Sequence, residues 1–288
     1  MKRLVACLLL SGLPAHAAIP LPDTDLWAAN LVIVEGKLTV ERARRITDVK
    51  GYENQPAFVD ETLIIYSAEA SEGQTDVFAL DVDSGERERL AATPESEFSP
   101  TPVPGGGLSA VRVAGDGTQQ LWLLRDGAKD YELLFPLLEG IGYHAWLDAN
   151  RVALFMIIPG KETAELHIAH RASGEVMIIS RDVGRSLQPW PGEPGSLAFI
   201  EPGADGKRWI KRFDFAERKL TPLIPVLEGS LDFTILPDGR LLMARGKELF
   251  ASQGDKWQPL AKLDQLPGII TRLAVNATGT RLVMVADE

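Results

Sequence analysis

The chain has 288 residues, of which 45% are hydrophobic and 24% are charged, and its formal net charge at neutral pH is −10. A hydrophobic fraction of this size is typical of a folded globular protein and argues against intrinsic disorder. The acidic balance argues against nucleic acid and anionic lipid as partners, because binding to phosphates requires a basic face.

The first 17 residues have the organisation of a cleavable signal peptide. Lys2 and Arg3 form a basic start, and the apolar run Leu4–Leu13 is too short to cross a bilayer as a helix. Ala15 and Ala17 match the small residues of a cleavage signature, so we expect cleavage after Ala17 and export to the bacterial periplasm. No later run reaches about 18 apolar residues, so the sequence predicts no transmembrane helix.

Cys7 is the only cysteine, and it lies inside the predicted signal peptide. The run Leu4–Cys7 also resembles the cleavage motif of a lipoprotein. Because only a few apolar residues precede this cysteine, the pattern favours cleavage after Ala17 over lipidation. The mature protein would then contain no thiol, which excludes disulfides, zinc–thiolate sites and a cysteine nucleophile.

The mature chain starts with two strand-like stretches over residues 24–34 and 38–47, separated by a turn at residues 35–37. A longer unit begins at Asn54 and is then repeated along the chain. It contains apolar runs over residues 62–67 and 76–82 and a Ser84–Gly85 turn. Short apolar runs that are bounded by glycine and aspartate turns are typical of antiparallel strands.

The repeat length predicts the architecture. The units open near residues 55, 99, 144, 188, 231 and 271, a spacing of 40 to 45 residues. The last unit ends after its second strand, and residues 24–47 match the missing outer half. The sequence therefore predicts an all-β fold, a six-bladed β-propeller of four-stranded antiparallel blades over residues 18–288. N-terminal outer strands and C-terminal inner strands would close its last blade.

Several short motifs resemble a known family. The first is a turn before an apolar strand, Pro237–Arg240. The second is a strand with the turn that follows it, Gln74–Asp81 with Asp83–Glu86. The third is a leucine followed by a Thr-Pro pair, Leu90 with Thr93–Pro94. In their repeated spacing these motifs resemble the TolB-type propeller repeats of exported bacterial proteins. The resemblance implies a six-bladed ring and a periplasmic location, without a specific role.

The candidate binding site consists of polar residues at the blade openings. The innermost strand of each propeller blade lines the central channel, so these distant residues are expected to converge on one channel mouth and to bind a ligand there. They are Asn54, Gln55, Glu97, Ser99, His144, Arg185, Ser186, Gln188, Asp232 and Arg272. An alternative interpretation is that they only hydrogen-bond channel waters and backbone groups, as buried polar groups must.

His144 has three candidate roles: a general base, a metal ligand, or a hydrogen-bonding wall of the channel. His167 and His170 resemble a metal-binding pair. They are three residues apart, however, and on a strand their side chains would point to opposite faces, so they are not expected to share a metal.

The sequence favours a non-catalytic binding or scaffold module. It contains no Gly-x-Ser-x-Gly elbow, phosphate loop, dinucleotide fingerprint or His-Glu-x-x-His motif. We expect a monomer without cofactor that binds a periplasmic protein or a small ligand. The alternative is a metal-assisted hydrolase, such as a lactonase, or a lyase, with oxygen ligands for calcium and His144 as the base. The oxygen ligands would come from Glu53, Asn54, Glu97 and Asp232.

Overall fold

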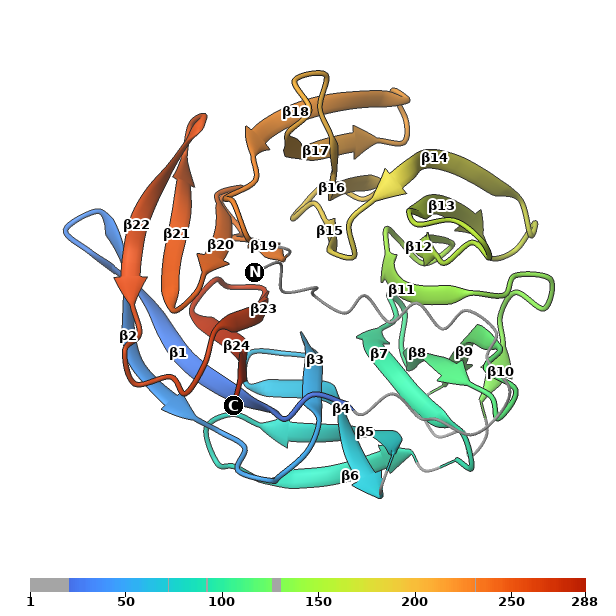
Figure 1. Cartoon of the computed structure of the whole chain (residues 1–288), viewed down its shortest axis with the longest axis horizontal. Coiled ribbons are helices and arrows are strands. Elements are labelled where there is room, and N and C mark those ends of the chain that lie inside the picture. The colour runs from blue at the N-terminus through green and yellow to red at the C-terminus, as the bar shows by residue number, and fades with distance from the viewer. Residues whose placement is uncertain (1–20, 72, 92, 126–130, 231) are drawn as a thin grey trace.

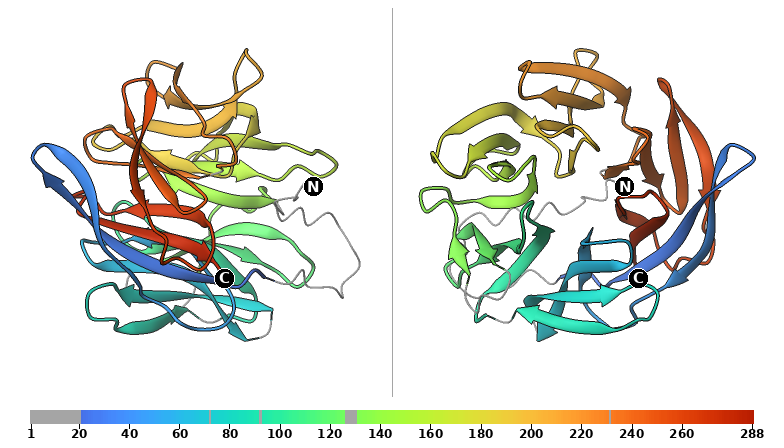
Figure 2. Two further views of the ribbon diagram at one scale, coloured as in Figure 1. Left: turned by 60° about the vertical axis from the view of Figure 1, so that its left-hand side comes forward. Right: turned by 180° about the vertical axis from the view of Figure 1, so that it is seen from behind.

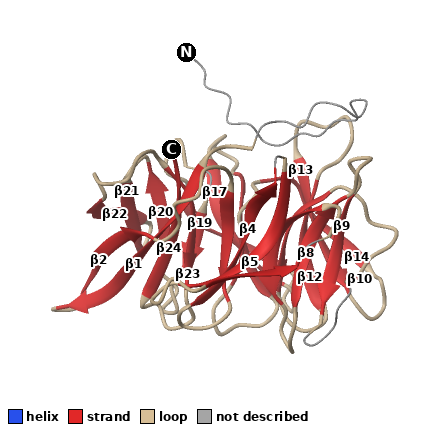
Figure 3. Cartoon of the chain, turned by 90° about the horizontal axis from the view of Figure 1, so that it is seen from below, coloured by secondary structure: helices blue, strands red, loops and turns tan. Residues whose placement is uncertain are grey.

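The computed structural model describes residues 21–71, 73–91, 93–125, 131–230 and 232–288. These residues form 24 strands in six four-stranded sheets, which stand around a central axis like the blades of a propeller (Figures 1, 2 and 3). The predicted signal peptide and its cleavage site lie outside the described residues. Within the described ranges, the chain has no helix with the length and hydrophobicity needed to cross a bilayer.

Five blades are continuous in the chain and run from the channel outwards. Blade 1 contains β3 (Glu53–Phe58), β4 (Leu63–Ser71), β5 (Gln74–Asp81) and β6 (Arg87–Ala91). Blade 2 contains β7 (Ser96–Pro102), β8 (Leu108–Val113), β9 (Gln119–Leu124) and β10 (Glu132–Leu133). Blade 3 contains β11 (Ile141–Trp146), β12 (Arg151–Met156), β13 (Ala164–His170) and β14 (Val176–Val183).

The next two blades follow the same order. Blade 4 contains β15 (Leu187–Pro189), β16 (Ser196–Pro202), β17 (Arg208–Asp214) and β18 (Lys219–Pro225). Blade 5 contains β19 (Phe233–Ile235), β20 (Leu241–Arg245), β21 (Glu248–Gln253) and β22 (Lys256–Lys262). Within each blade, neighbouring strands are antiparallel, so the predicted all-β propeller of six four-stranded blades is confirmed.

Blade 6 joins the two ends of the chain. Its inner strands are β23 (Ile270–Val275) and β24 (Arg281–Asp287), and its outer strands are β1 (Thr24–Val34) and β2 (Lys37–Arg45). On β1, Trp27 pairs with Met284 of β24 on one side and with Arg45 of β2 on the other. The predicted closure of the last blade is therefore confirmed.

The middle strands are buried on both faces because each blade packs between two neighbours. On β4, Ile64 and Tyr66 pack against Leu26 of blade 6, whereas Ile65 points the other way and packs near Ala110 of blade 2. Alternating side chains thus serve two different blade interfaces. This double burial explains why the second strand of each unit is a continuous apolar run instead of an alternating one.

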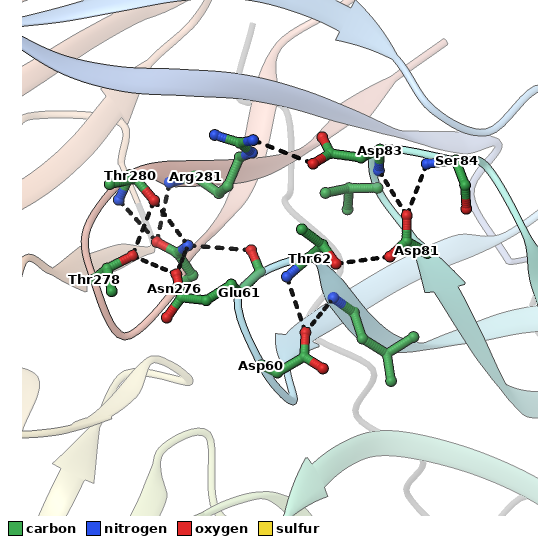
Figure 4. A network of polar contacts seen from close by, with 12 residues as sticks. Asp60, Glu61, Thr62, Asp81, Asp83, Ser84, Asn276, Thr278, Thr280 and Arg281 are labelled. Atoms are coloured by element: carbon green, nitrogen blue, oxygen red, sulfur yellow. Dashed lines mark hydrogen bonds and ion pairs between the residues drawn. The ribbon is translucent and has the colours of Figure 1, made fainter.

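A polar network reinforces the contact between blades 6 and 1 (Figure 4). The carboxylate of Glu61, in the turn between β3 and β4, accepts hydrogen bonds from the Asn276 amide at 2.7 Å and from the Thr278 hydroxyl. Arg281 of β24 forms an ion pair with Asp83 at 3.2 Å. The Glu61 bonds join two turns that are more than 200 residues apart in sequence, and all of these contacts link the split blade to its neighbour.

Candidate functional site

The inner strands of the six blades stand around the central axis (Figure 1). Residues on these strands and in the segments beside them line a cavity of about 370 Å³ in the channel. Eight of the ten candidate residues line this cavity, and each blade contributes at least one of them from its inner strand or the residues just before it. They are Gln55, Ser99, His144, Arg185, Ser186, Gln188, Asp232 and Arg272.

Asn54 and Glu97 are buried but do not line the cavity. The strand ladders in which they lie, β3–β4 and β7–β8, both contain a bulge near these residues, which changes the side to which neighbouring side chains point. Asn54 instead accepts a hydrogen bond from the N–H of Gln55 at 2.8 Å, and Glu97 accepts one from the Thr93 hydroxyl. The prediction that all ten side chains line the channel mouth is therefore wrong for Asn54 and Glu97.

Gln55 and Ser99 have left-handed backbone conformations, with φ angles of +59° and +53°. Such angles are uncommon for residues other than glycine, and each residue precedes a proline, which restricts its backbone further. Oε1 of Gln55 accepts a hydrogen bond from the N–H of Ser99 at 2.7 Å and so joins blades 1 and 2 at the cavity wall. These constraints hold both residues in fixed positions.

His144 is neutral in the folded protein. It is 7% exposed, and burial lowers its pKa to about 3. Its Nε2 lies 2.7 Å from the hydroxyl of Ser109, which also accepts a hydrogen bond from the Trp146 indole at 2.9 Å. A neutral imidazole held in this way is a weak base near neutral pH, and the geometry fits the role of a hydrogen-bonding wall.

Arg185 and Arg272 extend across the channel. Nη2 of Arg272, on blade 6, donates to the hydroxyl of Tyr143 on the opposite blade 3 at 3.0 Å, and its guanidinium lies 4.8 Å from the centre of that ring. Nη2 of Arg185 donates to the backbone oxygen of Thr271 at 2.7 Å. Burial lowers the pKa of Arg185, and the positive charge of Arg272 lowers it further.

The remaining three candidates connect or extend the wall. The hydroxyl of Ser186 donates to the backbone oxygen of Phe233 at 3.2 Å, and Oδ2 of Asp232 accepts from the N–H of Leu273 at 2.8 Å. Both bonds join neighbouring inner strands. Gln188 lines the main cavity and also an adjoining cavity of about 180 Å³.

The groups that the calcium alternative requires are divided between two places. Asp232, one of the oxygen donors, and His144, the candidate base, line the cavity, and the other oxygen donors do not. These other donors are Glu53, Asn54 and Glu97. Burial raises the pKa of Glu53 and of Glu97 to about 7 in each case. Within the described ranges, no group of three or more histidine, cysteine, aspartate or glutamate residues is placed to hold a metal ion.

Tyr143 is a channel residue that the sequence analysis missed. It lines the cavity beside His144 and contacts Arg272 through both its hydroxyl and its ring. Its position next to a blade opening is a signal that could have identified it. The predicted site contained only residues with amide, aliphatic hydroxyl, imidazole or charged side chains, and a phenol was not among them.

Sequence comparisons give no assignment. A scan against models of known protein families finds no match. A search of curated proteins finds no match either.

Comparison with solved structures finds propellers of different activities. The putative TolB from Agrobacterium tumefaciens is 11% identical with a TM-score of 0.71, covering 93% of this chain and 99% of that one. An oligogalacturonate lyase from Vibrio parahaemolyticus is 11% identical with a TM-score of 0.58, and the match covers 95% and 92% of the two chains. The gluconolactonase XC5397 from Xanthomonas campestris is 13% identical with a TM-score of 0.57, covering 96% and 99%. The TolB-type resemblance is thus confirmed for the fold.

Proposed function

We propose that this chain is an exported propeller that binds a protein partner or a small ligand in its central channel and does not catalyse a reaction. One observation carries the proposal: every blade contributes a polar residue to one cavity. The cavity volume of about 370 Å³ falls within the range of small-molecule sites. Hydrogen bonds between inner strands hold several of these residues in place, which lowers the entropic cost of binding.

The periplasmic location rests on the N-terminal pattern of basic, apolar and small residues. Expression of the full chain followed by fractionation and N-terminal sequencing tests it. The expected result is a periplasmic protein that begins at Ala18. A cytoplasmic protein with an intact N-terminus would contradict this part of the proposal.

Site-specific photocrosslinking in living cells tests binding at the channel. A photoreactive amino acid replaces Gln188, which lines both cavities, and the control probe replaces Leu220 on the outer strand β18 of the same blade. Leu220 is 38% exposed and is therefore accessible from outside the ring. The proposal predicts an adduct from position 188, seen by mass spectrometry as a crosslinked protein or as the added mass of a small ligand, and none from position 220. An adduct from position 220 alone would indicate that the outer face is the binding surface.

The metal-assisted hydrolase or lyase is the second candidate, and the presence of Asp232 and His144 together at the cavity favours it. The placement of Glu53 and Glu97 outside the cavity argues for the binding module instead. Metal analysis of the purified protein separates the two. Stoichiometric calcium whose removal by a chelator lowers the melting temperature would support the enzyme.

A further inference from the structure

The two channel arginines have only neutral hydrogen-bond partners. Arg272 donates to the Tyr143 hydroxyl, and Arg185 donates to the backbone oxygen of Thr271. Ion pairs between described residues involve other arginines, and none includes these two. We propose that the channel binds the carboxylate of a singly charged ligand between Arg185 and Arg272. This inference rests on the proposed function of the channel as the binding site.

The charges at the cavity fit one negative charge on the ligand. Arg185 and Arg272 are both protonated at physiological pH, because guanidinium groups do not lose their proton in proteins. Among the described residues that line the cavity, Asp232 is the only carboxylate, and His144 is neutral. Asp287, outside the lining, also interacts with Arg185, but burial raises its pKa and so favours its uncharged form. The lining itself carries two positive charges and one negative charge, which leaves a surplus of one positive charge. A monocarboxylate matches this surplus, whereas a phosphate dianion exceeds it.

The donors also fit a carboxylate. Each guanidinium has five N–H groups in a planar fork, and one nitrogen of each is already held by a neutral acceptor. This bond fixes the orientation of the fork and leaves other N–H groups for a ligand. Nε of Arg185 is buried and has no acceptor among the described residues. A carboxylate would supply acceptors for these N–H groups, and hydrogen bonds between charged groups are stronger than bonds to neutral acceptors.

The cavity lining also includes apolar residues, which could contact an apolar part of the ligand. Arg272 lies near the start of β23, and Val275 ends the same strand at the cavity, about 10 Å away at the usual rise per residue. Ala274, Pro56 and Pro100 also line the cavity. The ligand would therefore carry a carboxylate at one end and an apolar group at the other. A small organic acid and the C-terminus of a peptide share this chemistry.

Benzoate and benzamide are matched probes, because they have the same ring and differ in the charged group. We expect wild-type protein to bind benzoate with a Kd of about 1 mM by calorimetry or NMR, and benzamide at least about tenfold more weakly. Arg185→Gln and Arg272→Gln should each weaken benzoate binding by about tenfold or more. Arg245→Gln, a surface change on β20 that alters the net charge equally, is the control and should have no effect.

Equal affinity for benzoate and benzamide, or unchanged benzoate affinity in both channel variants, would overturn the inference. Tyr143→Phe removes the hydroxyl that orients Arg272 but keeps the charge, so it should weaken benzoate binding less than Arg272→Gln does. If a folded Tyr143→Phe variant binds benzoate more tightly than Arg272→Gln, the additional loss in Arg272→Gln reflects the missing charge and not a collapsed wall.

Competition distinguishes the two ligand sources. Whether the natural ligand is a small organic acid or a peptide C-terminus, the dipeptide N-acetyl-alanyl-leucine should displace benzoate at a lower concentration than its C-terminal amide does. If it also displaces benzoate at lower concentration than propionate does, the site fits a peptide terminus, and the reverse order indicates a free organic acid. If the carboxylate tests fail while the probe at position 188 still gives its adduct, only this inference falls. If both fail, the proposed function falls as well.

Discussion

The channel buries two arginines, whereas the interfaces between blades bury pairs of carboxylates. Asp232 lines the channel cavity together with Arg185 and Arg272, and Asp287 lies close enough to Arg185 for the two charges to interact. At the interface of blades 1 and 2, the carboxylate of Asp76, which forms an ion pair with Arg89, influences that of Glu97, so two buried acids share an enclosed space. At the interface of blades 6 and 1, Asp25 and Glu53 form an equivalent pair: Asp25 influences the pKa of Glu53.

The difference lies in how each charge can be neutralised. An enclosed carboxylate can take up a proton, and burial raises the pKa of Glu53 and Glu97 to about 7 and that of Asp25 to about 6. An arginine cannot lose its proton at accessible pH, so the surplus charge at the channel can be matched only by a bound anion or by solvent. The blade interfaces therefore respond to pH, and the channel is expected to respond to ligands.

Glu165 of β13 shows that burial alone does not decide whether the pKa of a carboxylate is raised or lowered. Like Asp25 and Asp76, it is a buried acid near the start of a third strand. The neighbours of its carboxylate are hydrogen-bond partners and not a second carboxylate. They include His167, at 2.9 Å, and Lys161, at 2.7 Å. These partners lower the pKa of Glu165 to about 2. At this interface the hydrogen bonds from basic partners outweigh burial and stabilise the ionised acid.

The largest predicted effect is a decrease of stability as pH rises. Folded Asp25, Glu53 and Glu97 retain protons that the unfolded chain releases near pH 4, so their contribution is complete below that pH and is lost as pH rises through 6 to 7. We expect the free energy of unfolding to fall by on the order of 3 kcal/mol between pH 5 and pH 8. Urea unfolding followed by tryptophan fluorescence measures it. Constant or rising stability over this range would contradict the account.

Removal of Arg45 should be the next largest effect. Arg45 of β2 forms an ion pair with buried Asp25 and a second one with Asp48 at 2.9 Å. Breaking a buried pair from one side is costly, and because Arg45 is partly exposed we expect Arg45→Met to destabilise the protein by about 2 kcal/mol at pH 7. Arg42→Met, at an exposed site on the same strand, is the control. The additional change Asp25→Asn should recover part of the loss.

Glu97→Gln should act in the opposite direction. It removes one of two like charges while keeping an oxygen that can accept the bond from Thr93. We expect a gain of about 1 kcal/mol in the free energy of unfolding at pH 8 and little change at pH 5, where Glu97 is already protonated. Glu165→Gln is the matched comparison and should destabilise at both pH values, because it removes ion pairs. If Glu97→Gln and Glu165→Gln change the stability in the same way, the two interfaces do not differ in how they treat a buried carboxylate.

The smallest predicted effect concerns Asp232. Asp232→Asn keeps an oxygen that can accept the bond from Leu273 and removes the negative charge from the cavity. The channel would then carry a surplus of two positive charges, so we expect benzoate to bind about threefold more tightly. Titration calorimetry on wild-type and variant protein checks this. Weaker binding would mean that Asp232 contacts the ligand directly or positions the arginines.

The fold could be predicted from sequence because its evidence is periodic. Six units of similar length and two unmatched half-units at the ends leave few topologies, and the pairing of β1 with β24 follows from them. Eight candidate residues could be placed at the channel for the same reason. The bulges that turn Asn54 and Glu97 away could not be predicted, because they depend on the local strand register.

Contacts between side chains of different blades could not be predicted from the sequence either. Arg272 meets Tyr143 only because blades 6 and 3 face each other at a particular channel width. The carboxylate pairs depend in the same way on how neighbouring blades stack. Glu53 and Glu97 were considered as channel donors because each opens an inner strand, whereas their buried partners lie on third strands of the preceding blades.

A crystal structure of the protein with 4-iodobenzoate tests the central claim most directly, because the anomalous signal of iodine locates the ligand independently of its carboxylate. We expect an iodine peak in the channel near Val275, with the carboxylate oxygens within hydrogen-bond distance of Arg185 and Arg272. An iodine peak only on the outer blade surfaces, or a channel ligand whose carboxylate points away from both guanidinium groups, would contradict it.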